Sequence, residues 1–230
     1  MPNPPCQRLH RLSTTLLLVM GLSGSGCAPP PENKLQEVIQ TGELVVVTRN
    51  SPTTYYEGPD GPTGFEYDLV RAFAKSLGVS VRMKSIDRFS DILPMIANGD
   101  GDLAAAGITV TPQRATQVRF SPSYQQIRQQ VIHSTRTPAP TNAKALVGRS
   151  IEVVAGTSYV ERLESLREKY PKLKWTEVQD METEELLIRV QEGQTEITIA
   201  DSNIVALNQQ YNPDLRVGFN LSDAEKLAWA

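Results

Sequence analysis

Residues 107–114 (GITVTPQR) combine three features that suit the binding of a small anion. Gly107 allows a backbone to approach a ligand closely, and Thr109 offers a hydroxyl group. The planar guanidinium of Arg114 matches the geometry of a carboxylate. An arginine in a loop is more often a solvated surface residue, so this segment alone does not establish a binding site.

Two further segments supply complementary groups. Asp201 follows an apolar run, where its carboxylate could accept hydrogen bonds from an ammonium group or cap the helix predicted to begin at Ile204. Thr157 and Ser158 follow Gly156 at the predicted start of another helix, where free amides and the helix dipole favour an anion. Together with Arg114, these residues match the two charges of an amino acid, and closure around it would exclude water.

The elements that must position these residues alternate between strand and helix. The first half predicts strands at 44–48, 79–83 and 103–106, with helices at 35–40, 67–77 and 90–97. The second half predicts strands at 150–154, 175–178 and 196–200, with helices at 158–169, 183–191 and 204–210. We therefore expect two α/β lobes, each a mostly parallel sheet flanked by helices. The candidate residues follow the carboxyl ends of the strands, where open α/β sheets bind ligands.

The predicted organisation places lobe 1 at residues 41–135 and lobe 2 at 136–220. Thr135–Ala143 contains two prolines and is predicted to link the lobes. Residues 28–40 form a proline-containing spacer and a first helix, and residues 221–230 begin a return to lobe 1.

Residues 1–27 have the layout of a secretory signal, with basic residues, a short apolar run and small residues before Cys27. Two interpretations fit this cysteine: lipidation after cleavage, or simple cleavage nearby without a lipid. The only other cysteine is Cys6, so the mature chain is expected to hold no disulfide and no cysteine-based metal site.

Composition excludes several classes of protein. The net charge of −3 and the absence of a basic stripe argue against nucleic-acid binding. After the export segment, His133 is the only histidine, which disfavours a histidine-dependent triad or metal site. No phosphate-binding or dinucleotide glycine motif is present, and we expect no cofactor.

The chain resembles solute-binding protein family 3, the periplasmic amino-acid-binding type, at segments spread over the mature sequence: 42–48, 63–69, 107–114, 120–124, 146–149 and 200–202. The resemblance implies a two-lobed, type II periplasmic-binding-protein-like fold. It also implies that Gly107, Thr109 and Arg114 hold a ligand carboxylate. Thr157 and Ser158 would close from the second lobe, Asp201 would take the amino group, and Tyr55 or Tyr56 would cover the ligand.

The segment after the first strand departs from that family, because Arg49 and Asn50 stand where an acidic residue is common. Here the chain resembles the membrane-bound lytic murein transglycosylase F family, as it also does at 63–67, 104–107, 199–203 and 227–230. In that family this module is a non-catalytic sensor followed by a lysozyme-like domain. The resemblance implies a periplasmic protein attached to the outer membrane and a ligand with an additional carboxylate, such as a muropeptide fragment.

Because the sequence stops at Ala230, we expect this chain to lack the catalytic domain and the final pieces of lobe 1, and not to cleave peptidoglycan. Two alternatives remain open from the residues. One is a stand-alone receptor that delivers an amino acid to a transporter. The other is a dehydratase-type enzyme on the same fold, which would need an acid with a perturbed pKa in the cleft.

Overall fold

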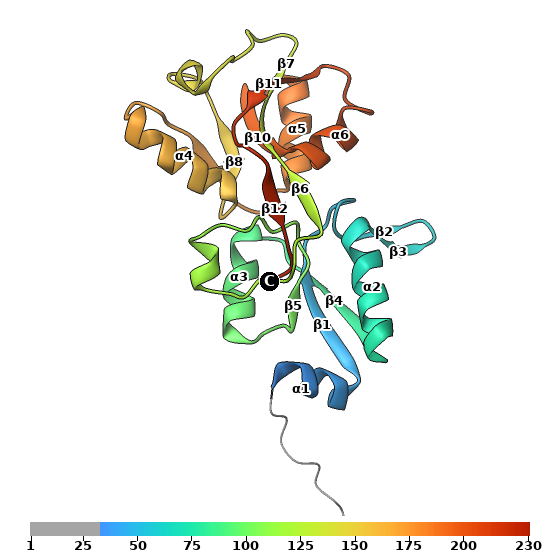
Figure 1. Cartoon of the computed structure of the whole chain (residues 1–230). Coiled ribbons are helices and arrows are strands. Elements are labelled where there is room, and N and C mark those ends of the chain that lie inside the picture. The colour runs from blue at the N-terminus through green and yellow to red at the C-terminus, as the bar shows by residue number, and fades with distance from the viewer. Residues whose placement is uncertain (1–32) are drawn as a thin grey trace, which may run out of the picture. The chain divides into compact units, whose positions relative to one another are not determined.

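The computed structural model describes residues 33–230, and the predicted export signal and Cys27 lie outside that range. Residues 33–230 belong to one compact unit, within which two lobes are built around separate cores (Figure 1). Over residues 33–230, none of the helices combines the length and apolar character needed to cross a bilayer.

The first lobe is centred on β1 (Glu43–Thr48), which pairs in parallel with β4 (Ser80–Ser85) and with β5 (Leu103–Ala104). Val46 and Val47 are both fully buried and point to opposite faces of the sheet. Val46 packs in the cluster that contains residues of α2, and Val47 packs in the cluster that contains residues of α3. The continuous apolar run of β1 therefore reflects a strand covered on both sides.

The helices of this lobe are α1 (Lys34–Thr41), α2 (Phe65–Leu77) and α3 (Phe89–Asn98). The region between β1 and α2 contains a short antiparallel hairpin of β2 (Tyr56–Gly58) and β3 (Gly61–Thr63). A 3₁₀ turn, η1, covers Arg114–Thr116.

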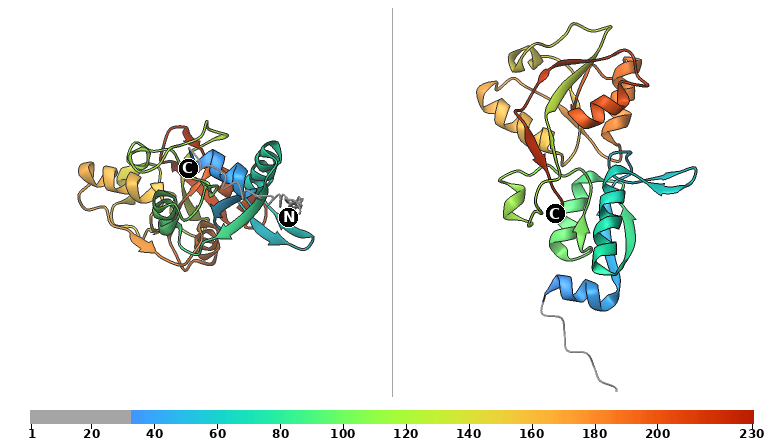
Figure 2. Two further views of the ribbon diagram at one scale, coloured as in Figure 1. Left: turned by 90° about the horizontal axis from the view of Figure 1, so that it is seen from below. Right: turned by 45° about the vertical axis from the view of Figure 1, so that its right-hand side comes forward.

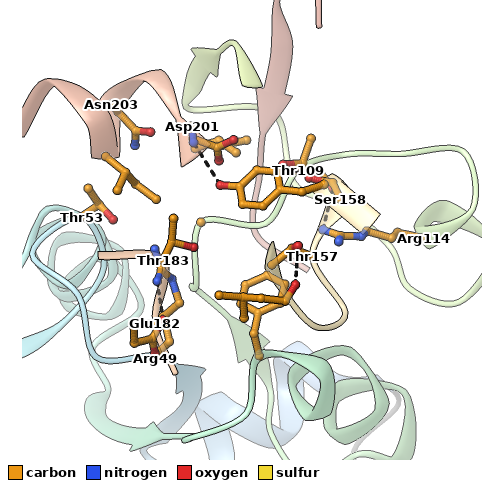
Figure 3. Close-up of a pocket in the computed structure, with 16 residues that line it drawn as sticks. Arg49, Thr53, Thr109, Arg114, Thr157, Ser158, Glu182, Thr183, Asp201 and Asn203 are labelled. Carbon is orange, nitrogen blue, oxygen red and sulfur yellow. Dashed lines mark hydrogen bonds and ion pairs between the residues drawn. The ribbon is translucent and has the colours of Figure 1, made fainter. Parts of the chain in front are cut away.

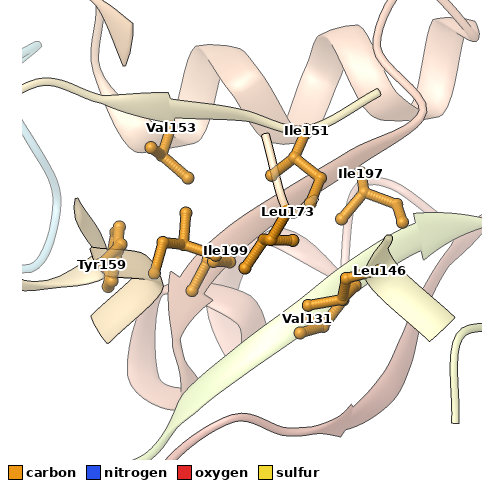
Figure 4. Close-up of a cluster of buried hydrophobic side chains, with 9 residues drawn as sticks. Val131, Leu146, Ile151, Val153, Tyr159, Leu173, Ile197 and Ile199 are labelled. Carbon is orange, nitrogen blue, oxygen red and sulfur yellow. The ribbon is translucent and has the colours of Figure 1, made fainter. Parts of the chain in front are cut away.

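The second lobe contains β7 (Gln129–Ser134), β8 (Glu152–Val154), β9 (Thr176–Val178), β10 (Ile197–Asp201) and β11 (Leu215–Asn220). Its helices are α4 (Ser158–Lys169), α5 (Thr183–Glu192) and α6 (Ser202–Asn208), with a 3₁₀ turn, η2, at Ala143–Leu146. One core packs against α4, and its buried side chains include Val131, Ile199 and Tyr159 (Figure 4). The other core packs against α5 and α6 and includes Ile132 and Ala200.

Two α/β lobes are confirmed, but the sheet of the second lobe is mixed where we predicted a mostly parallel one. β8 and β9 are parallel, whereas β7 runs antiparallel to both β10 and β11. The reason is the direction of entry. The chain enters this lobe from the first lobe along β7, so β7 runs away from the cleft while β10 runs toward it.

Two strands connect the lobes (Figure 2). β6 (Gln125–Ile127) precedes β7 and pairs antiparallel with β12 (Glu225–Leu227), which follows β11. Beyond β12, the amide groups of Ala230 and Ala104 exchange hydrogen bonds of 3.1 and 2.8 Å between their N–H and carbonyl groups, so the last residues lie against β5.

The crossing therefore occurs at residues 125–129 and not at Thr135–Ala143, where the sequence predicted it. Ser134 pairs with Leu215 inside the second lobe, and the Thr135 N–H donates to the Asp214 carbonyl at 2.9 Å. The two prolines mark a loop within that lobe. The crossing strand itself carries glutamines, which lack the apolar signal of a strand.

Candidate functional site

A cavity of about 20 Å³ lies where the two lobes meet, at the carboxyl ends of β1, β5, β8 and β10 (Figure 3). This volume accommodates about one water molecule and is far too small for an amino acid. Seven of the nine predicted binding residues contribute to its lining, namely Arg49, Gly107, Thr109, Arg114, Thr157, Ser158 and Asp201.

Arg114 lies in η1 and is only 3% exposed. Its three side-chain nitrogens have separate acceptors: Nε donates to Glu161 at 2.7 Å, Nη2 to the Gly156 carbonyl at 3.0 Å and Nη1 to the Thr109 carbonyl at 3.3 Å. The guanidinium also lies 5.9 Å from the ring centroid of Phe89. Arg114 therefore joins the lobes, since Thr109 belongs to one and Gly156 and Glu161 belong to the other.

Hydroxyl groups continue this contact between the lobes. Ser158 Oγ donates to Thr109 Oγ1 at 3.1 Å and accepts from Gln129 Nε2 at 3.0 Å. Thr157 Oγ1 donates to the Val154 carbonyl at 2.7 Å, which fixes the turn that opens α4.

Gly156, in the same turn, has a φ of +74°, and a Cβ there would lie 2.6 Å from the Cα of Ser90. Only glycine meets both the left-handed conformation and the close approach of the two lobes.

Asp201 ends β10 and is 4% exposed. Its backbone N–H donates to the Tyr159 hydroxyl at 3.0 Å, and within residues 33–230 its side chain makes no capping bond to α6. Asp201 Oδ1 and the neighbouring Asn203 Oδ1 are buried acceptors that lack a partner in this part of the chain. Burial raises the pKa of Asp201 to about 7, although the Tyr159 hydroxyl and Arg49 partly counteract it.

Arg49 follows β1 and is 4% exposed. Its Nη1 lies 2.5 Å from Glu182 Oε2 and 3.3 Å from Glu184 Oε2, and Ser51 Oγ also donates to Glu184. Burial alone would lower the pKa of Arg49, but the two carboxylates outweigh it and raise that pKa. Burial raises the pKa of Glu182, with Arg49 opposing that shift and Glu184 adding to it.

Glu66, in the first turn of α2, supports the site through hydrogen bonds within the first lobe. It is 1% exposed and accepts hydrogen bonds from the Gly107 N–H at 2.7 Å and the Tyr124 hydroxyl at 2.6 Å. Burial raises its pKa to about 7, and the two hydrogen bonds partly counteract that effect. Glu66 thus positions the Gly107 loop.

The two other predicted residues, Asn50 and Tyr55, are not among the residues that line the cavity. They form an isolated bridge with each other, and the Tyr55 hydroxyl contacts Glu57 while its ring packs edge-on against Tyr67. Tyr55 is therefore engaged by Glu57 of the hairpin and by Tyr67 of α2.

Other residues of the lining were not predicted from the sequence, namely Thr53, Phe89, Val154, Tyr159, Glu182, Thr183, Asn203, Ile204 and Leu227. Glu182 and Thr183 stand at the start of a correctly predicted helix after a strand, so the rule of strand carboxyl ends could have identified them. Across residues 33–230, no cluster of histidine, cysteine and acidic side chains is arranged to hold a metal ion.

Known proteins resemble this chain both in sequence and in structure. Over 220 residues the chain is 42% identical to membrane-bound lytic murein transglycosylase F of Pseudomonas fluorescens (strain Pf0-1), a match that covers 95% of this chain and 44% of that protein. A protein of the same name from Saccharophagus degradans is 41% identical over 223 residues, again with 44% of its length covered. The chain thus spans less than half the length of these curated relatives.

A solved structure of an ancestral arginine-binding protein bound to arginine aligns with a TM-score of 0.73 and 25% identity, covering 82% of this chain and 84% of that one. The family model for bacterial extracellular solute-binding proteins, family 3, matches residues 44–174, which is more than half of the chain. The chain therefore belongs to the bacterial extracellular solute-binding proteins of family 3.

Proposed function

We propose that this chain is the ligand-sensing module of a cell-envelope lytic transglycosylase, and that it binds an amino-acid-like or peptidoglycan stem-peptide fragment between its lobes. The observation that carries the proposal is the buried Oδ1 of Asp201 in the cavity between the lobes, which has no partner among residues 33–230. A buried acceptor without a donor is costly, and an ammonium group of the ligand would supply one.

The remaining charges suit the rest of such a ligand. Thr109 and Arg114 offer donors for one carboxylate, and Arg49 offers a second guanidinium for a further carboxylate. A stem peptide carries an amino group and several carboxylates, so it can use all three positions. Because the cavity is smaller than any amino acid, the lobes must open for entry and the side chains must rearrange around the ligand.

The sensor role rests on the likeness to transglycosylase F, of which this chain spans 44%. In a complete protein of that type, binding of a wall fragment to this module would change the activity of a lysozyme-like domain. Export to the periplasm and attachment to the outer membrane through Cys27 belong to the same proposal.

Two alternatives have support of their own. The likeness to an arginine-bound protein favours a transport receptor for free amino acids. The raised pKa of Asp201 favours a dehydratase-type enzyme, because a cleft acid that is half protonated near neutral pH can exchange protons with a substrate.

Isothermal titration calorimetry of the purified chain distinguishes the proposed function from these two alternatives. The probes are the tripeptide L-alanyl-γ-D-glutamyl-meso-diaminopimelate and the free amino acids arginine, glutamate and cysteine. We expect the tripeptide to bind more tightly than any amino acid, and Asp201→Asn to weaken its binding at least about tenfold, the effect of losing a charged hydrogen bond. Tighter binding of a free amino acid would contradict the sensor proposal.

A further inference from the structure

The two glutamates that hold Arg49 occupy the place where a ligand carboxylate would bind. Glu182 and Glu184 come from the start of α5 in the second lobe, whereas Arg49 follows β1 in the first lobe. Both carboxylates contact the same nitrogen, Nη1, and Ser51 binds Glu184 from the side of Arg49. This cluster therefore fastens the lobes together with no ligand involved.

The guanidinium of Arg49 carries one positive charge, so it can neutralise only one of the two carboxylates. Burial raises the pKa of Glu182, Arg49 opposes that shift, and repulsion by the Glu184 carboxylate adds to it. A pair of like charges sharing one cation is easier to separate than a matched ion pair.

The glutamates are also the more exposed members of the cluster. Their side chains are 18% and 17% exposed, against 5% for Arg49, so they can rotate into water while Arg49 remains in place. The position of both at a helix N-terminus stabilises their charge in either orientation.

We propose that Glu182 and Glu184 act as an internal substitute for the ligand: they hold Arg49 and keep the lobes closed until a ligand carboxylate displaces them. The cleft then selects ligands that carry a carboxylate at this end, in addition to the amino-acid group at Arg114 and Asp201. This inference rests on the proposed function, since it names the feature of the ligand that Arg49 recognises.

The closing role can be tested without a ligand by small-angle X-ray scattering of the double variant Glu182→Gln, Glu184→Gln. We expect a larger radius of gyration than for the wild type. Asp180→Asn is the matched control, because the Arg88–Asp180 pair also joins the lobes but does not contact Arg49, and its side chains are more than half exposed. An unchanged radius in a folded double variant, or an equal increase in the control, would overturn the closing role.

The selective role is tested by calorimetry with two tripeptides that differ in one group, L-alanyl-γ-D-glutamyl-L-lysine and its isoglutaminyl counterpart, in which the glutamyl carboxylate is an amide. We expect the double variant to bind the acid about tenfold more tightly than the wild type does, the order of one competing charged hydrogen bond. The gain for the amide should stay below about threefold.

Equal gains for both peptides, or weaker binding of the acid, would overturn the selective role. If neither peptide binds the wild type or the variant while the scattering still responds, the proposed function fails and the closing role stands. The two failures are therefore distinguishable.

Discussion

The two arginines of the cleft are buried to the same degree but are held in different ways. Arg114 is bound by the carbonyl oxygens of Thr109 and Gly156 as well as by the Glu161 carboxylate. Arg49 is bound by the carboxylates of Glu182 and Glu184. Backbone carbonyls move only when the fold moves, whereas glutamate side chains can change rotamer at little cost.

We call the end of the cleft at Arg114 the fixed end, because backbone carbonyls hold this arginine. We call the end at Arg49 the switchable end, because side-chain carboxylates hold that arginine. In the closed form the planar fork of Arg114 uses its three nitrogens on three acceptors, which fixes its orientation. Arg49 meets both carboxylates through one nitrogen, so its partners can be exchanged. Each prediction below tests this contrast.

The largest effect is expected from Arg114→Ala. The substitution removes the donor of the buried Thr109 carbonyl, of the part-buried Gly156 carbonyl and of the partly exposed Glu161 carboxylate. It should lower the free energy of unfolding by about 3 kcal/mol. Urea denaturation measures this loss. The exposed Arg128 provides a control, since Arg128→Ala should change stability by less than about 0.5 kcal/mol. A loss at position 114 no larger than this control would remove the distinction between the two ends.

A comparable effect is expected from pH at Asp201. Burial raises its pKa to about 7 from an ordinary 3.8, although the positive charges of both arginines oppose the shift. Between these values the folded state binds the proton and the unfolded state does not, so stability falls as pH rises through this window. Relative to Asp201→Asn, the wild type should lose on the order of 3 kcal/mol between pH 4 and pH 8. Parallel stability profiles for the two proteins would show that Asp201 is not perturbed.

Arg49→Ala should cost less than Arg114→Ala. The glutamates that lose their partner are partly exposed and can turn into water, so we expect a loss of about 1 to 2 kcal/mol in the same urea experiment. An equal loss at both positions would mean that Arg49 is as firmly fixed as Arg114, and the proposed exchange of its partners would fail.

A lysine at each position sharpens the contrast. One ammonium group can replace Nη1 of Arg49, so Arg49→Lys should cost less than about 1 kcal/mol. It cannot reach the three acceptors of Arg114, and Arg114→Lys should cost roughly 2 kcal/mol. Thermal unfolding of the pair gives the order directly, and a reversed order would contradict the assignment of fixed and switchable ends.

The smallest effect is expected at Asp180, whose exposed pair with Arg88 lies outside the cavity lining. Asp180 has a φ of +51°, a conformation that asparagine also tolerates. Asp180→Asn should leave the melting temperature unchanged within error, because exposed ion pairs contribute little. A clear decrease would show that contacts between the lobes stabilise the chain wherever they occur.

Much of the fixed end could be predicted from the sequence, because its signals are local. Gly107, Thr109 and Arg114 follow one strand within eight residues, and Asp201 directly follows another. The rule that ligands bind at strand carboxyl ends then brings the segments together. The continuous apolar run of β1 likewise indicated a strand covered on both faces.

At the switchable end, Arg49 was predicted as a site residue, but its pairing with the two glutamates could not be, because these partners are far apart in the sequence. Arg49 and Glu182 are separated by 133 residues, and neither segment contains a pattern that predicts contact with the other. Glu66 was missed for a different reason: an acid in the first turn of a helix is normally explained by the helix dipole and solvent. Its burial depends on Tyr124 and Gly107, which lie in other elements.

The absence of a side chain at Gly156 has a practical consequence. The backbone of the second lobe approaches Ser90 of the first lobe so closely that one methyl group would act as a wedge between them. Gly156→Ala would force the two backbones apart and lengthen the hydrogen bond from Arg114 Nη2 to the Gly156 carbonyl, without adding or removing a charge. One methyl group at this position would thus shift the chain from its closed form toward an open one.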